Sequence, residues 1–332
     1  MSDDRSEPAT LRRQGDDADI AALVARMRTG ERLATSRIVT ELERASPAMP
    51  AIVAALAPHL GRALVVGFTG PPGGGKSTLV NAYVGTLRAA GKSVAIIAVD
   101  PSSPISGGAI LGDRIRMTAT IADDGVFMRS LASGGHLGGL SPAAVRVIDA
   151  FDGAGKDVIV LETVGTGQNE IDVAEVADVR IVLSAPGLGD GIQAMKSGLL
   201  EIADVLVVNK ADRPGAEQTA QELTSALSLR TTEPLPKVIR TSAISGAGVT
   251  ELADEIARLA DALRNRLTPA ERRRRRARFL IARAAADLVT RAIRNAPPAE
   301  LSQLTDDVLS GTRSPDAAAR TYLVRSLGTP EE

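Results

Sequence analysis

A glycine-rich segment of the chain has the composition of a phosphate-binding loop. Residues 70–78 read GPPGGGKST and match the pattern G-x-x-x-x-G-K-[ST]. The glycines allow backbone N–H groups to converge on phosphate oxygens, and Lys76 supplies a positive charge for the terminal phosphates. We therefore predict that this loop binds a nucleotide and that Ser77 ligates Mg²⁺. The predicted phosphate contacts are Gly70, Pro71, Pro72, Gly73, Gly74, Gly75, Lys76, Ser77 and Thr78.

A second polar motif, N-K-A-D at 209–212, ends a buried apolar run. The Asp212 carboxylate suits guanine, because it can accept hydrogen bonds from N1–H and the 2-amino group, whereas adenine would leave it unpaired. Lys210 can lie across the base, and Asn209 can hold the loop or reach N7. Following a phosphate loop in this order, the motif predicts GTP rather than ATP. The predicted base contacts are Asn209, Lys210, Asp212, Ser242, Ala243 and Ile244.

Three acidic residues at strand ends or in glycine-rich loops are candidates for metal binding. Asp100 ends VAIIAVD, Asp113 lies in GGAILGD and Glu162 ends DVIVLET. The carboxyl ends of parallel strands line the ligand crevice, so we expect these groups to hold Mg²⁺ and orient the attacking water. Each acid taken alone could instead cap a helix. After Glu162, the Gly165 N–H can meet a γ-phosphate and Gln168 can position water.

The elements that must position these residues follow from the apolar pattern. Strand-like runs occur at 63–68, 94–100, 125–130, 157–163, 179–184, 204–209 and 236–242, and helical patterns lie between several of them, such as 77–90. Most runs are continuously apolar, which is typical of a parallel sheet covered on both faces. We predict an α/β fold of the P-loop NTPase type, with a doubly wound, mostly parallel sheet at residues 61–262.

Helical segments flank this domain. Residues 1–17 are polar and expected to be disordered, two helices are predicted within 19–43, and a third at 52–60, giving an N-terminal helical part at 1–60. The C-terminal arm, 263–332, is predicted to contain helices at 268–295 and 315–327. In it Ile281, Ala285, Leu288 and Ala292 form an apolar seam suited to dimerisation. The basic run 272–276 is interpreted as a solvated helix face.

Composition excludes several classes of function. The 332 residues carry 39 Lys and Arg against 40 Asp and Glu, so there is no overall basic field for nucleic acid. With no Cys and two His, disulfides, thiolate metal sites and His-rich metal sites are excluded. No signal peptide or apolar run of about 18 residues is visible, so we expect a cytoplasmic protein that binds neither nucleic acid nor membrane.

The motifs GPPGGGKST, ETVGTGQNE, APGLGDGIQAMKSG, NKAD and TSA together resemble one family. It comprises the P-loop GTPase chaperones of adenosylcobalamin-dependent acyl-CoA mutases, including the methylmalonyl-CoA mutase accessory proteins, and some relatives carry the label lysine/arginine/ornithine-transport kinase. The resemblance covers about residues 20–265. It implies a Mg²⁺-dependent GTPase that hydrolyses GTP to GDP and phosphate. It also implies a homodimer, joined by C-terminal arms, that gates cofactor loading of the mutase and protects it from inactivation.

The resemblance also implies roles for individual residues. It maps the metal and switch acids onto Asp100, Asp113 and Glu162, and a third switch onto 187–198, which contains Asp190, Gln193 and Lys196. It maps a charge-stabilising arginine onto Arg116, although the residues alone leave open whether Arg114, Arg116 or neither acts on the transition state.

Two other functions compete with this one. A metal-insertion GTPase of nickel-enzyme maturation would share the fold, but that class uses His or Cys ligands, which this chain nearly lacks. A P-loop small-molecule kinase would need an acceptor pocket and a lid, and it has no use for the guanine motif.

Overall fold

The computed structural model describes residues 9–100, 123–132, 140–163, 169–187, 198–228 and 234–327. Contacts divide the chain into two compact units, residues 1–276 and 277–332. Within the described ranges, no helix is both long enough and apolar enough to cross a membrane. The prediction of three parts with limits at 60 and 262 stays a prediction.

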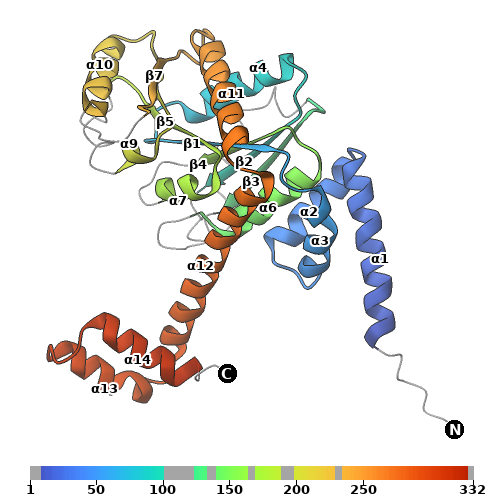
Figure 1. Cartoon of the computed structure of the whole chain (residues 1–332), viewed down its shortest axis with the longest axis vertical. Coiled ribbons are helices and arrows are strands. Elements are labelled where there is room, and N and C mark those ends of the chain that lie inside the picture. Colours follow the sequence, from blue (N-terminus) through green and yellow to red (C-terminus); the bar gives the residue numbers. More distant parts are fainter. Residues whose placement is uncertain are drawn as a thin grey trace. The chain divides into compact units, whose positions relative to one another are not determined.

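The first unit is built on a seven-stranded sheet with the order β3-β2-β4-β1-β5-β6-β7 (Figure 1). All of its strand pairs are parallel. The strands are β1 (Leu64–Thr69), β2 (Val94–Asp100), β3 (Val126–Ala132), β4 (Val158–Thr163), β5 (Val179–Ser184), β6 (Val205–Val208) and β7 (Lys237–Arg240). Every residue of the central strands β1 and β4 is buried, as continuous apolar runs require. The predicted doubly wound α/β fold is confirmed.

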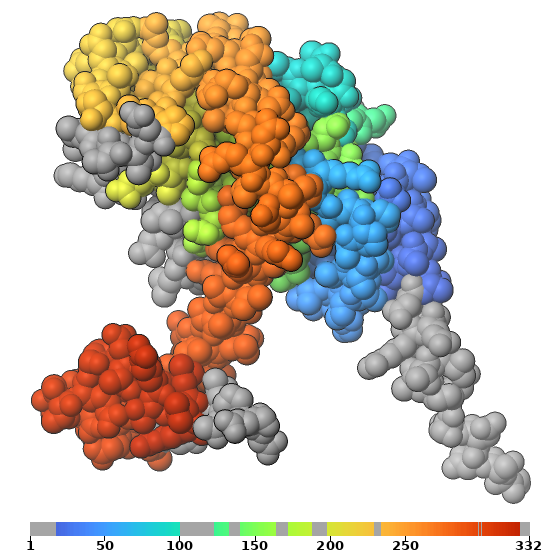
Figure 2. All heavy atoms as spheres, in the orientation of Figure 1, coloured from blue at the N-terminus to red at the C-terminus, as the bar shows by residue number. Residues whose placement is uncertain are grey.

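Helices cover both faces of the sheet. On one face, α4 (Lys76–Ala89) and α11 (Val249–Arg266) contact each other and share an apolar core with the strands, the α4–α11 core. Figure 2 shows these two helices side by side. On the other face lie α7 (Asn169–Val176), α9 (Leu199–Ile202) and α10 (Ala216–Leu227). The helix α6 (Pro142–Gly153) contacts β2 and β4.

The N-terminal helices are α1 (Ala9–Arg28), α2 (Arg32–Glu43) and α3 (Met49–Leu56), followed by the 3₁₀ turn η1 (Ala57–His59). Packing of α2 against α6 connects them to the sheet. The expectation of disorder over residues 1–17 is wrong for residues 9–17, which form the first turns of α1. Those turns continue a helix whose later residues Val24 and Met27 are buried, so tertiary packing supports the polar first turns.

The start of α12 (Pro269–Asn295) corrects the interpretation of the basic run. Arg272 and Arg276 are only 4% and 3% exposed, so this side of the helix is not solvated. Arg272 Nη1 donates to Asp178 Oδ2 at 2.9 Å, and Arg272 Nη2 donates to the Gly61 carbonyl at 2.8 Å. The same Asp178 oxygen accepts a hydrogen bond from Val65 N at 3.0 Å. The basic run therefore attaches the first turns of α12 to the entry of β1.

The second unit contains the rest of α12, α13 (Pro298–Leu309) and α14 (Pro315–Leu327). Its small core is formed by Leu304, Ala318 and Tyr322, with Ala292 packed against them. The predicted seam is divided: Ile281 and Leu288 are 69% and 61% exposed, whereas Ala292 belongs to this core. The sequence prediction lacks α13. Pro297 and Pro298 follow the predicted helix 268–295 and are typical of a helix end, but proline is also favoured at a helix start, and Pro298 is the first residue of α13.

Candidate functional site

The glycine-rich loop lies between the end of β1 and the start of α4, at the carboxyl edge of the sheet. Gly70, Gly73 and Gly75 have φ angles of 136°, 78° and 86°, which other residues rarely adopt. A Cβ on Gly75 would also lie 2.6 Å from Asn209 Nδ2. The loop therefore needs glycine both for its backbone shape and for its contact with the N-K-A-D motif.

Lys76 lies across the loop that it follows. Its side chain is largely buried, and Nζ donates hydrogen bonds to the Gly70 carbonyl at 2.7 Å and the Pro71 carbonyl at 2.9 Å. These bonds hold the ammonium group at the centre of the loop. The first residues of α4 direct their N–H groups to the same place, and a helix N-terminus favours negative charge. The arrangement can bind the phosphates of a nucleotide.

Ser77 and Glu162 bring two oxygen-bearing side chains together next to the loop. Ser77 Oγ donates to Glu162 Oε1 at 2.6 Å, and both residues are buried. Glu162 reaches this position because β4 pairs in parallel with β1 and aligns it with Phe68, two residues before the loop. A hydroxyl and a carboxylate are hard oxygen donors of the kind that Mg²⁺ prefers, so the pair fits this ion. The strand β2, which ends at Asp100, pairs with β4 at the same edge.

Asn209 connects the phosphate loop to the second motif. Its Nδ2 donates to the Gly74 carbonyl at 2.9 Å, and its Oδ1 accepts from Thr241 Oγ1 at 3.1 Å. Of the two roles considered for Asn209, this geometry supports holding the loop. Thr241, to which sequence analysis gave no role, is completely buried and completes the connection to β7.

The predicted base contacts surround a single pocket of about 80 Å³. Lys210 has a positive φ of 58°, and its Nζ donates to the Gly73 carbonyl at 2.6 Å, so its stem lies along the pocket. A hydrogen bond with Ser242 lowers the pKa of Asp212, which keeps this exposed carboxylate ionised near neutral pH. Arg213 also lines the pocket and was missed, although its place next to Asp212 was a signal. The lining is Gly75, Thr78, Asn209, Lys210, Asp212, Arg213, Ser242, Ala243 and Ile244.

Several predicted site residues lie outside the described ranges. They are Asp113, Arg114, Arg116, Gly165, Gln168, Asp190, Gln193, Lys196 and the side chain of Asp100. Among the residues that are described, no group of three or more His, Cys, Asp or Glu side chains could hold a metal ion. Of the predicted metal ligands, Ser77 and Glu162 are the two whose side chains the structure describes.

The chain is similar in sequence to known GTPases, in agreement with the phosphate loop and the guanine-type motif described above. Residues 35–298 match the family described as Methylmalonyl Co-A mutase-associated GTPase MeaB. A Pyrococcus horikoshii protein is 41% identical over 314 residues, covering 93% of this chain and 99% of that protein. The Escherichia coli GTPase ArgK is 38% identical over 246 residues, covering 72% of this chain and 76% of that protein. The mouse protein methylmalonic aciduria type A homolog, mitochondrial, is 41% identical over 195 residues, covering 57% of this chain and 47% of that protein.

A solved structure supports the fold over nearly the whole chain. The crystal structure of LAO/AO transport system kinase superposes with a TM-score of 0.74 at 28% identity, covering 94% of this chain and 98% of that one. The phosphate loop, the guanine-type motif and the family match agree. The chain belongs to the methylmalonyl-CoA mutase-associated GTPase family and is a P-loop GTPase.

Proposed function

We propose that residues 70–78 bind the phosphates of GTP and that the 80 Å³ pocket binds its guanine base. The position of Lys76 at the centre of the loop and the ionised carboxylate of Asp212 support these assignments. Asn209 joins the two parts, so base and phosphate contacts would be made by one rigid frame. Ser242, Ala243 and Ile244 line the pocket together with Lys210.

We also propose that hydrolysis depends on Mg²⁺. Ser77 and Glu162 would hold the ion together with Asp100 and Asp113, and the bound ion would neutralise charge on the phosphate oxygens. In this proposal Glu162 also orients the attacking water with Gln168, the Gly165 N–H meets the γ-phosphate, and Arg116 offsets charge that develops on the transferring group. The observed contact of Ser77 with Glu162 supports the first of these assignments.

We propose that the physiological role is that of a chaperone or gatekeeper for an adenosylcobalamin-dependent acyl-CoA mutase, such as methylmalonyl-CoA mutase. The observation that carries this proposal is the match of residues 35–298 to a family named for its association with that mutase. The mouse relative, named for methylmalonic aciduria, supports it as well. A GTPase can regulate such a client only if its GTP-bound and GDP-bound states differ in affinity for the client.

The experiment that tests the role compares GTP hydrolysis with and without a purified methylmalonyl-CoA mutase. We expect the mutase to accelerate hydrolysis by the parent protein and not by Lys196→Ala, which lies in the proposed third switch and outside the phosphate loop. Lys237→Ala, at a half-exposed lysine of β7, is the matched control and should respond like the parent. If the mutase does not change the rate of GTP hydrolysis by the parent, the client assignment is wrong. If the mutase accelerates hydrolysis by Lys196→Ala as much as by the parent, the switch assignment is wrong.

We further propose that the protein is a cytoplasmic homodimer that binds neither nucleic acid nor membrane. Two large apolar side chains of α12, Ile281 and Leu288, are exposed in the single chain, and covering such residues is a common reason for association. We retain a functional division into an N-terminal helical part (1–60), a GTPase domain (61–262) and a C-terminal dimerisation arm (263–332).

A further inference from the structure

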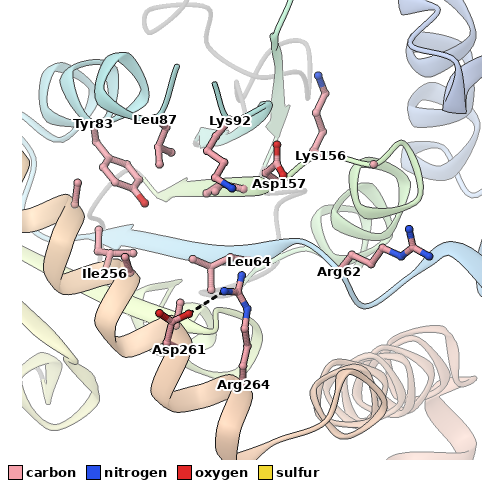
Figure 3. Close-up of a pocket in the computed structure, with 15 residues that line it drawn as sticks. Arg62, Leu64, Tyr83, Leu87, Lys92, Lys156, Asp157, Ile256, Asp261 and Arg264 are labelled. Atoms are coloured by element: carbon pink, nitrogen blue, oxygen red, sulfur yellow. Dashed lines mark hydrogen bonds and ion pairs between the residues drawn. The ribbon is translucent and has the colours of Figure 1, made fainter. Parts of the chain in front are cut away.

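A second and larger pocket lies at the amino edge of the sheet, opposite the nucleotide site. It has a volume of about 400 Å³, in the range of about 300–1,000 Å³ typical of small-molecule sites. Its walls come from the first residues of β1 and β4, the last turns of α4 and the second half of α11 (Figure 3). Nothing in the proposed function uses it.

The floor of this pocket is apolar. Leu64 and Ile256 are buried there, and Leu87 of α4 adds a third aliphatic side chain. Leu64 and Ile256 belong to the α4–α11 core and Leu87 packs directly against it, so the surface that they present to the pocket is rigid. Such a floor can hold a short hydrocarbon chain or a ring.

One polar group projects from this apolar wall. Tyr83 is only 2% exposed, its ring lies 5.6 Å from that of Phe68, and its hydroxyl points into the pocket (Figure 3). None of the described residues makes a hydrogen bond with that hydroxyl. Burial raises the pKa of Tyr83, so the hydroxyl stays protonated. Buried tyrosine hydroxyls usually have a hydrogen-bond partner, and here the partner must come from inside the pocket.

The rim of the pocket is positively charged. Four basic side chains, Arg62, Lys92, Lys156 and Arg264, line it together with two acidic ones, Asp157 and Asp261, which leaves a formal excess of two positive charges. An excess of one sign around a concave site favours a ligand of the opposite sign.

Existing contacts reduce the availability of some of these groups. The Asp157 carboxylate accepts hydrogen bonds from Ser93 N at 2.7 Å and Ser93 Oγ at 2.8 Å, and Lys156 Nζ donates to the Gly125 carbonyl at 3.3 Å. The ammonium of Lys92 interacts electrostatically with Asp157, but it has no hydrogen bond or ion pair with any residue in the described ranges. Within the described part of the chain, Arg264 pairs with exposed Asp261 alone, at 3.1 Å, and exposed pairs of this kind are weak. In Figure 3 the Arg62 side chain points away from Leu64 and Tyr83, which line the pocket. We therefore assign Lys92 and Arg264 as the cations that a ligand would meet.

We propose that this pocket binds a small amphipathic organic anion. A carboxylate or phosphate group would pair with Lys92 and Arg264 at the rim. The apolar part would lie on the floor formed by Leu64, Leu87 and Ile256. A polar atom along the ligand would complete the hydrogen bond of Tyr83. This pocket is separate from the nucleotide site, so the proposal does not depend on the proposed function.

The chain offers a direct probe, because it contains only two tyrosines, Tyr83 and Tyr322. Full-length protein labelled with 3-fluorotyrosine should give two ¹⁹F resonances, which Tyr322→Phe assigns. GDP and Mg²⁺ are kept at saturating concentrations, so that the nucleotide site is occupied and cannot bind the phosphate group of the probe. We expect hexanoate or hexyl phosphate to shift the Tyr83 resonance saturably and to leave Tyr322 unchanged, which also reports that the protein stays folded. Whichever of the two compounds binds with the higher affinity identifies the preferred anionic group as carboxylate or phosphate.

Controls separate an anion site from a simple apolar hollow. Hexanol, the neutral analogue, should shift Tyr83 at least tenfold more weakly. Lys92→Gln and Arg264→Gln should each weaken binding of the better anion about 5–10-fold. Arg266→Gln, an exposed arginine on the same turn of α11 that does not line the pocket, should change nothing. The proposal would be overturned if neither anion shifts the Tyr83 resonance, or if hexanol shifts it as strongly as the anions do. It would also be overturned if Lys92→Gln and Arg264→Gln both bind the better anion with the affinity of the parent.

Discussion

Single side chains determine how the two recognition motifs are held together. Asn209 was considered for either the loop or the base, and its contacts with Gly74 and Thr241 assign it to the loop. In the proposed nucleotide site, Asp212 is then the carboxylate that would meet the base, with Lys210 along the pocket wall. Base specificity should therefore depend on one charged side chain.

Replacing Asp212 with Asn should weaken GTP binding by about 1–3 kcal/mol, because guanine N1–H and the 2-amino group lose their ionised acceptor. The same change should shift preference towards xanthosine triphosphate, which offers an oxygen where guanine has the amino group. Titration of both nucleotides against parent and variant measures the effect. Asp254→Asn, at an exposed carboxylate of α11, is the control, and unchanged GTP affinity in Asp212→Asn would refute the base assignment.

Gly75→Ala should reduce GTP affinity about tenfold or more. The new methyl group needs the left-handed backbone region and lies 2.6 Å from Asn209 Nδ2, so the loop must move away from its tether. Gly85→Ala is the matched control on α4, since its backbone is helical and an added Cβ there would meet no atom within 4 Å. That control should keep full GTP binding and gain about 0.5–1 kcal/mol of stability. Equal binding by both variants would count against this account of the loop.

At the level of elements, the strands could be predicted and the long-range ion pairs could not. The seven apolar runs are local signals, and parallel pairing then brings Glu162 beside the phosphate loop without further information. Asp178, by contrast, is 94 residues from Arg272, and no local pattern relates them. The available signal was spacing: Arg272 and Arg276 are four residues apart and share a helix face, whereas Arg274 lies on the exposed side.

Arg272→Met should destabilise the first unit by about 3–5 kcal/mol, because it leaves the buried carboxylate of Asp178 without its closest charge partner. Arg274→Met removes an exposed charge from the same helix turn and should change stability by less than about 0.5 kcal/mol. Urea unfolding of the two variants beside the parent provides the comparison. Similar losses in both would mean that helix propensity, and not the buried pair, accounts for the effect.

At the level of the whole molecule, the sequence indicated a helical arm and an apolar seam but not which residues of the seam stay exposed. Ala292 has the spacing of the seam, yet it packs into the small core around Tyr322, whose hydroxyl donates to the Ala292 carbonyl at 3.0 Å. Periodicity alone cannot separate these cases, since the core around Ala292 includes Leu304 of α13, a helix that the sequence prediction lacks. Of the predicted seam, Ile281, Ala285 and Leu288 are exposed, and these residues remain available for the proposed dimerisation.

The double variant Ile281→Gln/Leu288→Gln in the full chain should convert a dimer into a monomer, because both side chains lose the apolar surface whose burial favours association. Its GTP affinity should equal that of the parent, since neither residue belongs to the nucleotide site. Val53→Gln, at a 45% exposed valine of α3, controls for the loss of a surface apolar group and should leave the dimer intact. Sedimentation equilibrium with GDP present measures all three proteins. A parent that is monomeric, or a double variant that remains dimeric, would show that these residues do not form the interface, and the arm would then need a different role.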